Sequence, residues 1–320
     1  MSLAVVILAA GQGTRMKSAL PKALHEAAGR TLLEHVVRVA RALDPEHLAV
    51  IIGHGAERVR ARFPNPDFDF VLQREQLGTG HALMQTRALL EDKAEAVMVL
   101  NMDGPLVRAE TLGALLEHHR ASGAGMTMLT AEVGDPEGLG RIVREGDGSV
   151  RAIVEEKDAS EEERRIGEIN PGFFVFDREV FRLGERLSNS NASGEYYITD
   201  LAHLYLGEGK SVQAVLMKEP SEALAVNDRA QLAVIDRLLR DRVRGRWLRE
   251  GVTMVAPEQT FIDDTVRLEP DVVLHPGVVL RGETVVRRGA VLGPYAVLSD
   301  CTVREDAWVA PFTQAEGQTF

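Results

Sequence analysis

The chain has 320 residues, 45% of them hydrophobic, so it exceeds one ordinary domain of about 100 to 200 residues and can bury a sizeable core. Its formal net charge of -11 argues against a surface built for nonspecific binding to nucleic acid or to an anionic membrane. The single cysteine, Cys301, excludes an intramolecular disulfide and favours a reducing, cytoplasmic location. No stretch approaches the roughly 18 apolar residues of a transmembrane helix, so we expect a soluble protein without a membrane partner.

Short β-rich runs alternate with helical patterns from Leu3 to about Asn227, which is typical of βαβ units and a mostly parallel sheet. The first run is interpreted as a buried strand and not as a signal peptide, because it is short, has no basic residue before it and leads straight into Gly11. The predicted strands cover residues 4–10, 48–53, 68–73, 96–103, 126–133 and 172–176. Amphipathic spacing predicts helices on both faces, over residues 32–43, 81–90 and 111–120. Two short runs between glycines predict a hairpin over residues 140–156, which would roof a substrate pocket.

The pattern changes beyond the first domain, which we expect to cover residues 1–228. Apolar residues at helical spacing predict a connecting helix, assigned to residues 229–250. Farther on, apolar residues recur every six positions with one five-residue step: Ile262, Leu268, Leu274, Leu280, Val286, Leu292, Leu298, Val303 and Val309. This spacing, with Pro and Gly at intervals, predicts a left-handed parallel β-helix over residues 251–320. A β-sandwich, whose turns come every ~8–12 residues, fits the strict six less well.

A Gly-rich loop follows the first predicted strand, from Gly11 to Lys22. Its glycines let backbone N–H groups approach a phosphate at the carboxyl edge of the sheet, and Arg15 and Lys22 add positive charge. The dinucleotide fingerprint fails because Met16 stands where its third glycine belongs. The Walker loop fails because no Lys-Ser or Lys-Thr follows a suitably spaced glycine pair. The loop by itself therefore predicts phosphate binding without either of these chemistries.

Asp103 lies at the end of the predicted strand over residues 96–103, which places its carboxylate at the same sheet edge. Mg²⁺ is usually held by one or two protein oxygens together with phosphates and waters, so Asp103 is the first candidate metal ligand. The alternative is a simple strand-end turn, since Asp-Gly-Pro is good turn chemistry. The adjacent histidines His118 and His119 point to different faces of a helix, form no metal cluster and are predicted to lie at the surface.

Several separated motifs occur in an order that identifies a family. Residues 8–16 with Pro21-Lys22 resemble the signature of sugar nucleotidyltransferases. The segments 73–82, 168–170, 194–200 and 226–229 resemble N-acetylglucosamine-1-phosphate uridyltransferases, and the similarity continues into the hexapeptide repeats. Nearly the whole chain thus resembles the bifunctional N-acetylglucosamine-1-phosphate uridyltransferase and glucosamine-1-phosphate acetyltransferase family.

The resemblance implies a Rossmann-like nucleotidyltransferase domain with a mostly parallel mixed sheet, a long linker helix and a short left-handed β-helix. It implies Mg²⁺-dependent transfer of a uridylyl group from UTP to N-acetylglucosamine-1-phosphate, which gives UDP-N-acetylglucosamine and pyrophosphate for cell-wall (peptidoglycan) precursor synthesis. It also implies a cytoplasmic homotrimer assembled through the β-helix. The acetyltransferase site of the family lies in further coils, so we expect no acetyltransferase activity in this chain.

The family pattern also assigns site roles. Asp103 and Asn227 would hold Mg²⁺, although Asn227 also suits an N-cap of the helix that follows. Arg15 and Lys22 would hold the UTP phosphates, with Arg15 stabilising the leaving pyrophosphate, so Arg15, Lys22 and Asp103 are the candidate catalytic residues. The further substrate-binding candidates are Leu8, Ala9, Ala10, Gly11 and Gly13 in the loop, Gln73, Gly78 and Thr79 for uracil, Asn101 beside the metal, and Gly140, Glu155 and Asn170 for the sugar.

The chain departs from the family pattern near the metal position. Asn101 and Met102 replace a Tyr-Gly pair, and Pro171 replaces a threonine, so sugar preference or rate is expected to differ. Two alternatives stay open: a nucleotidyltransferase for another NTP or sugar-1-phosphate, and a non-catalytic trimeric assembly protein.

Overall fold

The computed structural model describes residues 2–320, which group into two compact units. The first unit contains residues 2–25 and 32–228, and the second contains residues 26–31 and 229–320. Six residues from the sequence range expected for the first domain, Glu26–Thr31, therefore group with the second unit. Among residues 2–320, no helix is long and apolar enough to cross a membrane.

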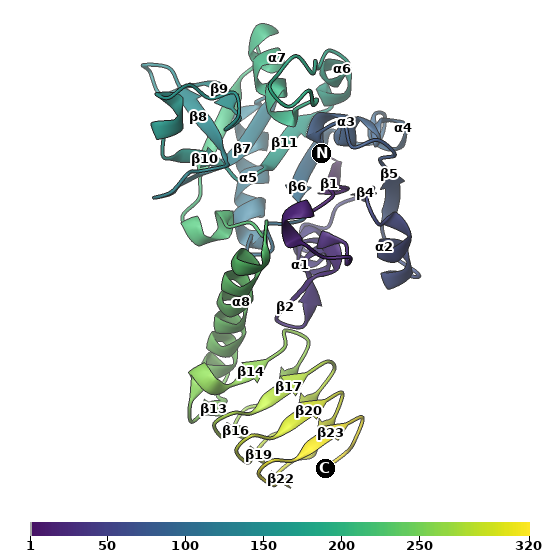
Figure 1. The fold of residues 1–320 in the computed structure, drawn as a ribbon, viewed down its shortest axis with the longest axis vertical. Coiled ribbons are helices and arrows are strands. Elements are labelled where there is room, and N and C mark those ends of the chain that lie inside the picture. Colours follow the sequence, from purple (N-terminus) through teal and green to yellow (C-terminus); the bar gives the residue numbers. More distant parts are fainter. Residues whose placement is uncertain (1) are drawn as a thin grey trace. The chain divides into compact units, whose positions relative to one another are not determined.

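A ten-stranded sheet forms the centre of the first unit (Figure 1), in the order β5-β4-β1-β6-β11-β7-β10-β8-β9, with β12 beside β7. Its strands are β1 (Leu3–Ala9), β4 (His47–Ile52), β5 (Asp69–Leu72), β6 (Ala96–Asn101), β7 (Met126–Glu132), β8 (Gly140–Arg144), β9 (Val150–Val154), β10 (Glu168–Asn170), β11 (Phe173–Asp177) and β12 (Val212–Leu216). The neighbours β5, β4, β1 and β6 are parallel, whereas β11 is antiparallel to both β6 and β7. The expected mixed α/β fold is confirmed, but the sheet is less parallel than expected, because β7–β10, β10–β8 and β8–β9 are also antiparallel.

Helices cover both faces of this sheet. Successive side chains of a strand point to opposite faces, so a strand that is apolar throughout needs covering on both. One face packs with α3 (Thr79–Met84), α6 (Val180–Gly184) and α7 (Leu201–Gly207) around buried residues such as Val6 and Val99. The other face carries α5 (Ala109–Ser122), whose His119 Nδ1 lies 2.8 Å from Thr127 Oγ1 of β7. The remaining helices of this unit are α1 (Leu32–Arg41), α2 (Ala56–Arg62) and α4 (Arg87–Leu90), with short 3₁₀ turns η1 (Thr14–Met16), η2 (Lys22–Leu24), η3 (Glu163–Arg165), η4 (Ile198–Asp200) and η5 (Pro220–Ala223).

Two local predictions on helices were wrong. The expected helix over residues 81–90 is split into α3 and α4, where the buried Thr86 hydroxyl donates to the Leu83 carbonyl at 2.7 Å and competes with the helical ladder. His119 does not lie at the surface: it is buried, and this burial lowers its pKa below the usual value. His118, its neighbour, is exposed as expected.

The second unit contains the helix α8 (Arg229–Arg249) and a parallel β-helix of short strands (Figure 1). Three sheets form its walls: β13 (Thr253–Met254), β16 (Val273–Leu274), β19 (Val291–Leu292) and β22 (Trp308–Val309); β14 (Phe261–Ile262), β17 (Val279–Arg281), β20 (Val297–Ser299) and β23 (Gln314–Glu316); and β15 (Arg267–Leu268), β18 (Val285–Val286) and β21 (Thr302–Val303). A 3₁₀ turn, η6 (Pro257–Gln259), precedes β14. All nine residues of the six-residue pattern are buried in one core, so the predicted repeat is confirmed.

Residues 26–31 form a two-stranded hairpin, β2 (Glu26–Ala27) and β3 (Arg30–Thr31), within the second unit. Ala28 and Gly29 both have positive φ, 47° and 80°, which is the backbone of a type I′ hairpin turn. A Cβ on Gly29 would meet Asp263 Cγ at 2.3 Å, so only glycine permits this close approach of the turn to the first coil. The hairpin is therefore packed within the second unit, although the chain before and after it belongs to the first.

Candidate active site

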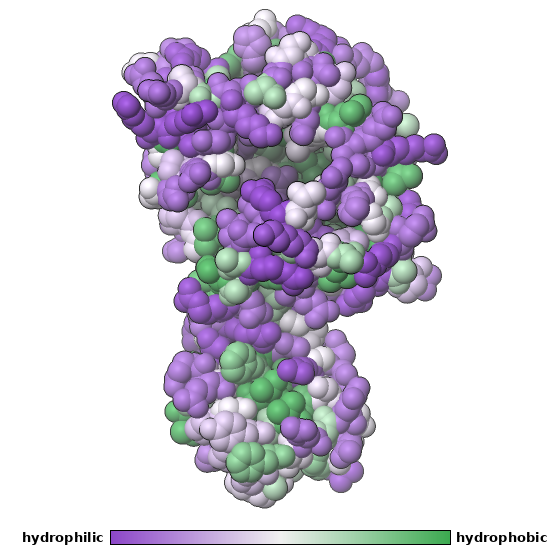
Figure 2. All heavy atoms as spheres, in the orientation of Figure 1, coloured by the Kyte–Doolittle hydropathy of each residue, from purple (hydrophilic) through white to green (hydrophobic). Residues whose placement is uncertain are grey.

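A cavity of about 550 Å³ opens at the carboxyl ends of β1 and β6. From β1 the chain continues to β4 on one side, and later returns to β6 on the other side, so this is the switch point of the sheet. Open α/β sheets bind ligands in the crevice outside such a point. In Figure 2 the visible surface of the first unit is mostly hydrophilic. The cavity walls come from the predicted phosphate loop, the segment after β5, the end of β6, and residues Glu195 and Asn227.

The Gly-rich loop is shaped by its glycines in two different ways. Gly13 has φ of 60°, and a Cβ there would meet Lys22 Cβ at 2.8 Å, so the glycine lets the two ends of the loop close on each other. Gly11 has neither a positive φ nor any atom within 4 Å of a built Cβ, although it lines the cavity. Nothing in the chain therefore requires glycine at position 11, whereas a ligand pressed against the backbone would.

Four side chains from distant parts of the sequence meet at the cavity. Lys22 Nζ donates to Asp103 Oδ2 at 2.6 Å and lies 3.5 Å from Asn227 Oδ1. Arg15 Nη2 donates to the same Asn227 oxygen at 2.8 Å. The Asn227 segment is fixed beside the strand end because Val226 N donates to the Asp103 carbonyl at 2.8 Å. The structure thus brings together the predicted catalytic and metal-binding residues, with two cations and one carboxylate.

The oxygens of Asp103 and Asn227 converge on one position that suits a cation. The ammonium of Lys22 stands there now, in contact with both oxygens, and so acts as a stand-in for a positively charged ligand. A hard divalent cation that binds phosphates usually takes only one or two of its ligands from the protein, and one carboxylate and one amide oxygen fit that number. Within residues 2–320, no group of three or more His, Cys, Asp and Glu side chains is arranged to hold a metal.

The segment predicted to read the base forms a second wall. Gln73 is buried, and its Nε2 donates to the Gly78 carbonyl at 3.1 Å. Gly78 has φ of 111°, and a Cβ there would lie 2.5 Å from the Tyr196 carbonyl oxygen. The Thr79 hydroxyl accepts a hydrogen bond from Ile198 N at 3.0 Å. This wall is therefore held by the segment around Tyr196, which places Gln73, Gly78 and Thr79 on the cavity.

The three predicted sugar residues lie together, but outside this cavity. Asn170 is the sheet partner of Gly140, and a Cβ on Gly140 would lie 3.5 Å from Glu155 Oε2. Glu155 lines a neighbouring cavity of about 420 Å³. Gly172 connects this group to the first cavity, because its N–H donates to Asn170 Oδ1 at 2.9 Å while its α-carbon packs on Asn101. Ala9 is buried and does not line the first cavity, whereas Leu8, Ala10, Gly11, Gly13 and Asn101 do.

Met102 and Asn101, the two departures from the family pattern, lie differently. Both line the cavity, but Met102 is buried, so most of its bulk is directed into the protein. Asn101 Nδ2 would lie only 1.8 Å from a Cβ on Gly172, whose φ is 86°. Glycine is thus needed at position 172 for two reasons: it permits the positive φ, and it leaves room for the side chain of Asn101.

We expect Gly172→Ala to destabilise the first unit by about 1 to 2 kcal/mol through its left-handed backbone alone, with a further cost from the clash with Asn101. Urea denaturation gives the free energy of unfolding. The double variant Asn101→Ala/Gly172→Ala should regain the stability lost to the clash, but not the stability lost to the strained backbone. Strictly additive effects of the two substitutions would show that Asn101 is not displaced.

Burial raises the pKa of Glu155 above its usual value, and nearby carboxylates including Asp200 add to the effect, while the Thr199 hydroxyl, which donates to Glu155 Oε1 at 2.9 Å, opposes it. Between the usual value of about 4.3 and the raised pKa, the folded state binds more protons than the unfolded state. The free energy of unfolding therefore falls as pH rises through this interval.

We expect Glu155→Gln to remove that fall, so that the variant gains stability relative to wild type as pH rises above about 4.3. Urea denaturation at a series of pH values measures it. Glu137→Gln, at an exposed position, is the control and should leave the pH dependence unchanged. Parallel curves for Glu155→Gln and wild type would contradict the expected cost of this buried carboxylate.

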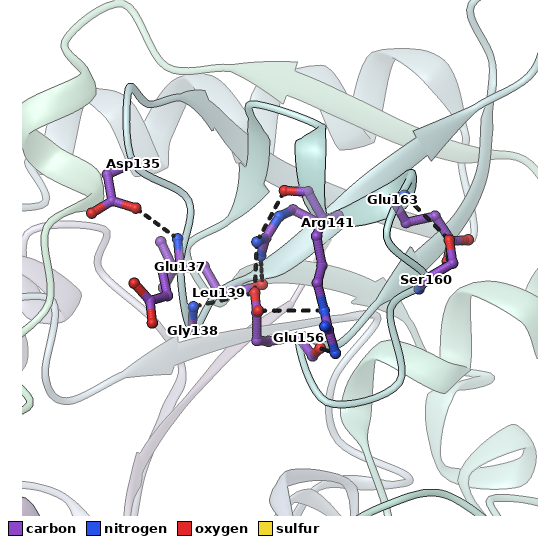
Figure 3. A network of polar contacts seen from close by, with 9 residues as sticks. Asp135, Glu137, Gly138, Leu139, Arg141, Glu156, Ser160 and Glu163 are labelled. Atoms are coloured by element: carbon purple, nitrogen blue, oxygen red, sulfur yellow. Dashed lines mark hydrogen bonds and ion pairs between the residues drawn. The ribbon is translucent and has the colours of Figure 1, made fainter.

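A buried arginine holds the hairpin β8–β9 and the segment after it (Figure 3). Arg141 is 1% exposed; its Nη2 donates to Glu156 Oε2 at 2.6 Å, and its Nη1 donates to the Leu139 carbonyl. Glu156 also accepts from Gly138 N at 3.2 Å. Because Glu156 follows Glu155 directly, this pair fixes the backbone from which Glu155 projects.

Sequence reasoning missed several residues at these sites: Gln12, Thr14, Gln76, Ala82 and Glu195 in the first cavity, and Arg141 and Thr199 behind the second. Most lie inside the quoted motifs, but they carry no separate chemical signal. Arg141 follows Gly140 in a strand, and a charged residue in a strand is normally predicted to face solvent. Only tertiary packing shows that it is buried.

The fold and cavity define an α/β domain of the nucleotide-transferring class, and a family model described as a MobA-like NTP transferase domain matches residues 5–254. A structure assigned as a glucose-1-phosphate thymidylyltransferase from Bacillus anthracis, solved in complex with a sucrose, superimposes with a TM-score of 0.63. It is 20% identical and covers 75% of this chain and 96% of that chain, so it shows the fold alone.

Curated relatives narrow the class further. The bifunctional protein GlmU of Stutzerimonas stutzeri (strain A1501) is 45% identical over 320 residues, which cover 99% of this chain and 70% of that protein. The GlmU proteins of Alkaliphilus oremlandii (strain OhILAs) and Pelotomaculum thermopropionicum (strain DSM 13744 / JCM 10971 / SI) are 44% and 46% identical over 274 residues, 85% of this chain. The chain spans 60% of the length of each of the latter two. The chain belongs to the GlmU family.

Proposed function

We propose that this protein transfers a uridylyl group from UTP to N-acetylglucosamine-1-phosphate, with Mg²⁺, and releases pyrophosphate. The observation that carries the proposal is the contact of Lys22 with Asp103 and Asn227 beside the Gly-rich loop. An oxygen of the sugar phosphate attacks the α-phosphorus of UTP, and the bond to the pyrophosphate oxygen breaks. The reaction needs in-line positioning and charge neutralisation more than acid or base work.

The chain's own residues supply these two requirements. The backbone around Gly11 accepts the triphosphate at the sheet edge, and Arg15 and Lys22 neutralise the charge that develops on the leaving pyrophosphate. Asp103 and Asn227 would hold Mg²⁺ through the two oxygens that now contact Lys22 Nζ. The ion would supply positive charge that offsets part of the negative charge of the phosphates.

The acceptor subsite is proposed to extend from Asn101 toward Gly140, Glu155 and Asn170. Contacts through Gly172 connect these residues in an unbroken row. Carboxylate and amide groups at such positions suit the hydroxyl and N-acetyl groups of an amino sugar. The product would serve cell-wall precursor synthesis.

The test is pyrophosphate release with Mg²⁺, each of the four common NTPs and a panel of sugar-1-phosphates. The proposal expects release with UTP and N-acetylglucosamine-1-phosphate above every other combination. Release only with another NTP or another sugar would replace the substrate assignment, and no release with any pair would support the non-catalytic alternative.

A homotrimer through the β-helix is proposed as the assembly. Its support is the set of exposed aromatic side chains on that unit, among which Tyr295 and Phe312 stack with ring centroids 5.4 Å apart. Tyr295 is 53% exposed and Phe312 72% exposed, and apolar residues gather on the visible face of the β-helix (Figure 2). Light scattering at several concentrations tests the assembly, and a monomer throughout would exclude it.

A further inference from the structure

Two residues of the site stand next to the points where the chain passes between the units. Lys22 precedes Glu26, the first residue of the docked hairpin, by four positions. Asn227 precedes Arg229, the first residue of α8, by two positions. Lys22 Nζ and Asn227 Oδ1 lie 3.5 Å apart in the first unit. Anything that fixes the hairpin against α8 within the second unit therefore limits how far these two side chains can separate.

The hairpin is fixed there by its turn. Ala28 N donates to Asp236 Oδ1 of α8 at 2.7 Å, and Asp264 N donates to the Ala28 carbonyl at 2.8 Å. Arg30 Nε donates to Asp264 Oδ2 at 2.9 Å. Ala28 is fully buried, so these bonds are shielded from water. A backbone amide buried at a turn needs an acceptor, and here that acceptor is one carboxylate oxygen.

Asp236 is itself held in place. Arg240, one helical turn later, donates from Nε to Asp236 Oδ2 at 2.9 Å, while its Nη1 lies 3.3 Å from Asp263 Oδ1. Asp263 is also the residue on which Gly29 packs. The carboxylate that accepts from Ala28 is thus oriented by a neighbour that contacts the other side of the docking site.

We propose that Asp236 is a positioning residue for the transfer reaction, acting through the Ala28 amide to keep Lys22 beside Asn227. This inference rests on the proposed function for its kinetic effect, but not for its structural effect. The geometry of phosphoryl-type transfer is strict, and a displacement of about 1 Å far from the reacting atoms can cost on the order of a hundredfold in rate. The hairpin then serves as a connection between the phosphate loop and α8.

The test compares Asp236→Ala with Asp236→Asn in the whole chain. The alanine variant removes the acceptor. Asparagine keeps one oxygen, to which Ala28 N donates at 2.7 Å and Arg240 Nε at 3.2 Å, but it loses the charge and the second oxygen that accepts from Arg240. We expect kcat to fall on the order of tenfold in Asp236→Ala with a smaller change in KM for UTP, and to be largely restored in Asp236→Asn. Asp241→Ala is the matched control, since Asp241 lies on α8 and pairs with Arg244.

Hydrogen exchange without substrates gives a readout independent of activity. Leu24 N and His25 N bond to the Pro21 and Lys22 carbonyls, and Val226 N bonds to the Asp103 carbonyl. Asp236→Ala should speed exchange at these amides in the first unit, which a purely local role in the second unit would not do. Arg30→Gln weakens the contact of the hairpin with Asp264 and should also speed exchange at these amides. This variant provides the test if Asp236→Ala does not fold.

Unchanged kcat and unchanged exchange in Asp236→Ala, or in Arg30→Gln if the alanine variant does not fold, would overturn the inference. Equal losses in Asp236→Asn and Asp236→Ala would overturn the assigned path through the Ala28 amide. An inactive wild-type protein would defeat the proposed function alone, because the exchange measurements would still decide whether the dock orders the Lys22 and Asn227 segments.

Discussion

Asp103→Asn is expected to lower the rate of pyrophosphate release by at least on the order of a thousandfold with the fold intact. The substitution keeps the shape of the side chain and an oxygen that can accept from Lys22 Nζ, which lies 2.6 Å from the native carboxylate. It removes the one negative charge among the four side chains that meet at the cavity. A neutral amide is a much weaker ligand for Mg²⁺ than a carboxylate, so the loss should appear in kcat.

The fold should survive because the main-chain contact at this point is unchanged. Val226 N donates to the Asp103 carbonyl, which the substitution does not touch. The matched control is Asp92→Asn, at an exposed position of the same unit, and should have wild-type activity. Thermal unfolding establishes that both variants fold. An Asp103→Asn variant that keeps activity within tenfold of wild type would reject Asp103 as the metal ligand.

The parts of the fold that sequence alone predicts are those governed by local periodicity. Strands buried on both faces, such as β1 and β6, read as continuous apolar runs. The β-helix follows from a spacing that no other architecture repeats so strictly, and each predicted position is buried. Asp103 was found because it lies at the end of a predicted strand, where α/β sheets bind ligands, whereas the role of Asn227 came from the family resemblance.

What sequence does not reveal is which distant segments meet. Ala28 and Asp236 are 208 positions apart, and nothing in a short Glu-Ala-Ala-Gly turn indicates that it docks on a helix beyond the domain boundary. His119 was placed at the surface because it is adjacent to His118 on a helix and forms no metal-ligand cluster with it, but its ring contacts Thr127 of the sheet. The sugar candidates are adjacent to one another, yet only the structure shows that they lie outside the phosphate cavity and are connected to it through Gly172 and Asn101.

Removal of the carboxylate at Glu156 should cause a large loss of stability, because its ion-pair partner is almost fully buried. Its partner Arg141 has a side chain that is 2% exposed, whereas that of Glu156 is 28% exposed. We expect Glu156→Ala to lower the free energy of unfolding by about 3 kcal/mol, because it leaves a buried guanidinium without its counter-charge. The Leu139 and Arg164 carbonyls still accept from Arg141, which places the value at the low end of the range for such pairs.

Glu179→Ala provides the comparison within the same unit. Its pair with Arg182 spans 2.7 Å, close to the 2.6 Å of the Arg141–Glu156 pair, but the side chain of Arg182 is 48% exposed. The expected loss is below about 1 kcal/mol, since water screens an exposed pair and solvates the charge that remains. Urea denaturation of both variants therefore isolates the effect of burial at nearly constant distance and chemistry.

The double variant Arg141→Met/Glu156→Ala decides what the loss means. If the cost of Glu156→Ala comes from an unpaired buried charge, then replacing that charge by an apolar side chain of similar length should restore most of the stability. If it comes from the lost hydrogen bonds of the hairpin segment, such as that from Gly138 N to Glu156, the double variant should be no more stable than the single one. The first outcome is expected, because the burial of Arg141 is nearly complete while Gly138 lies at an exposed turn.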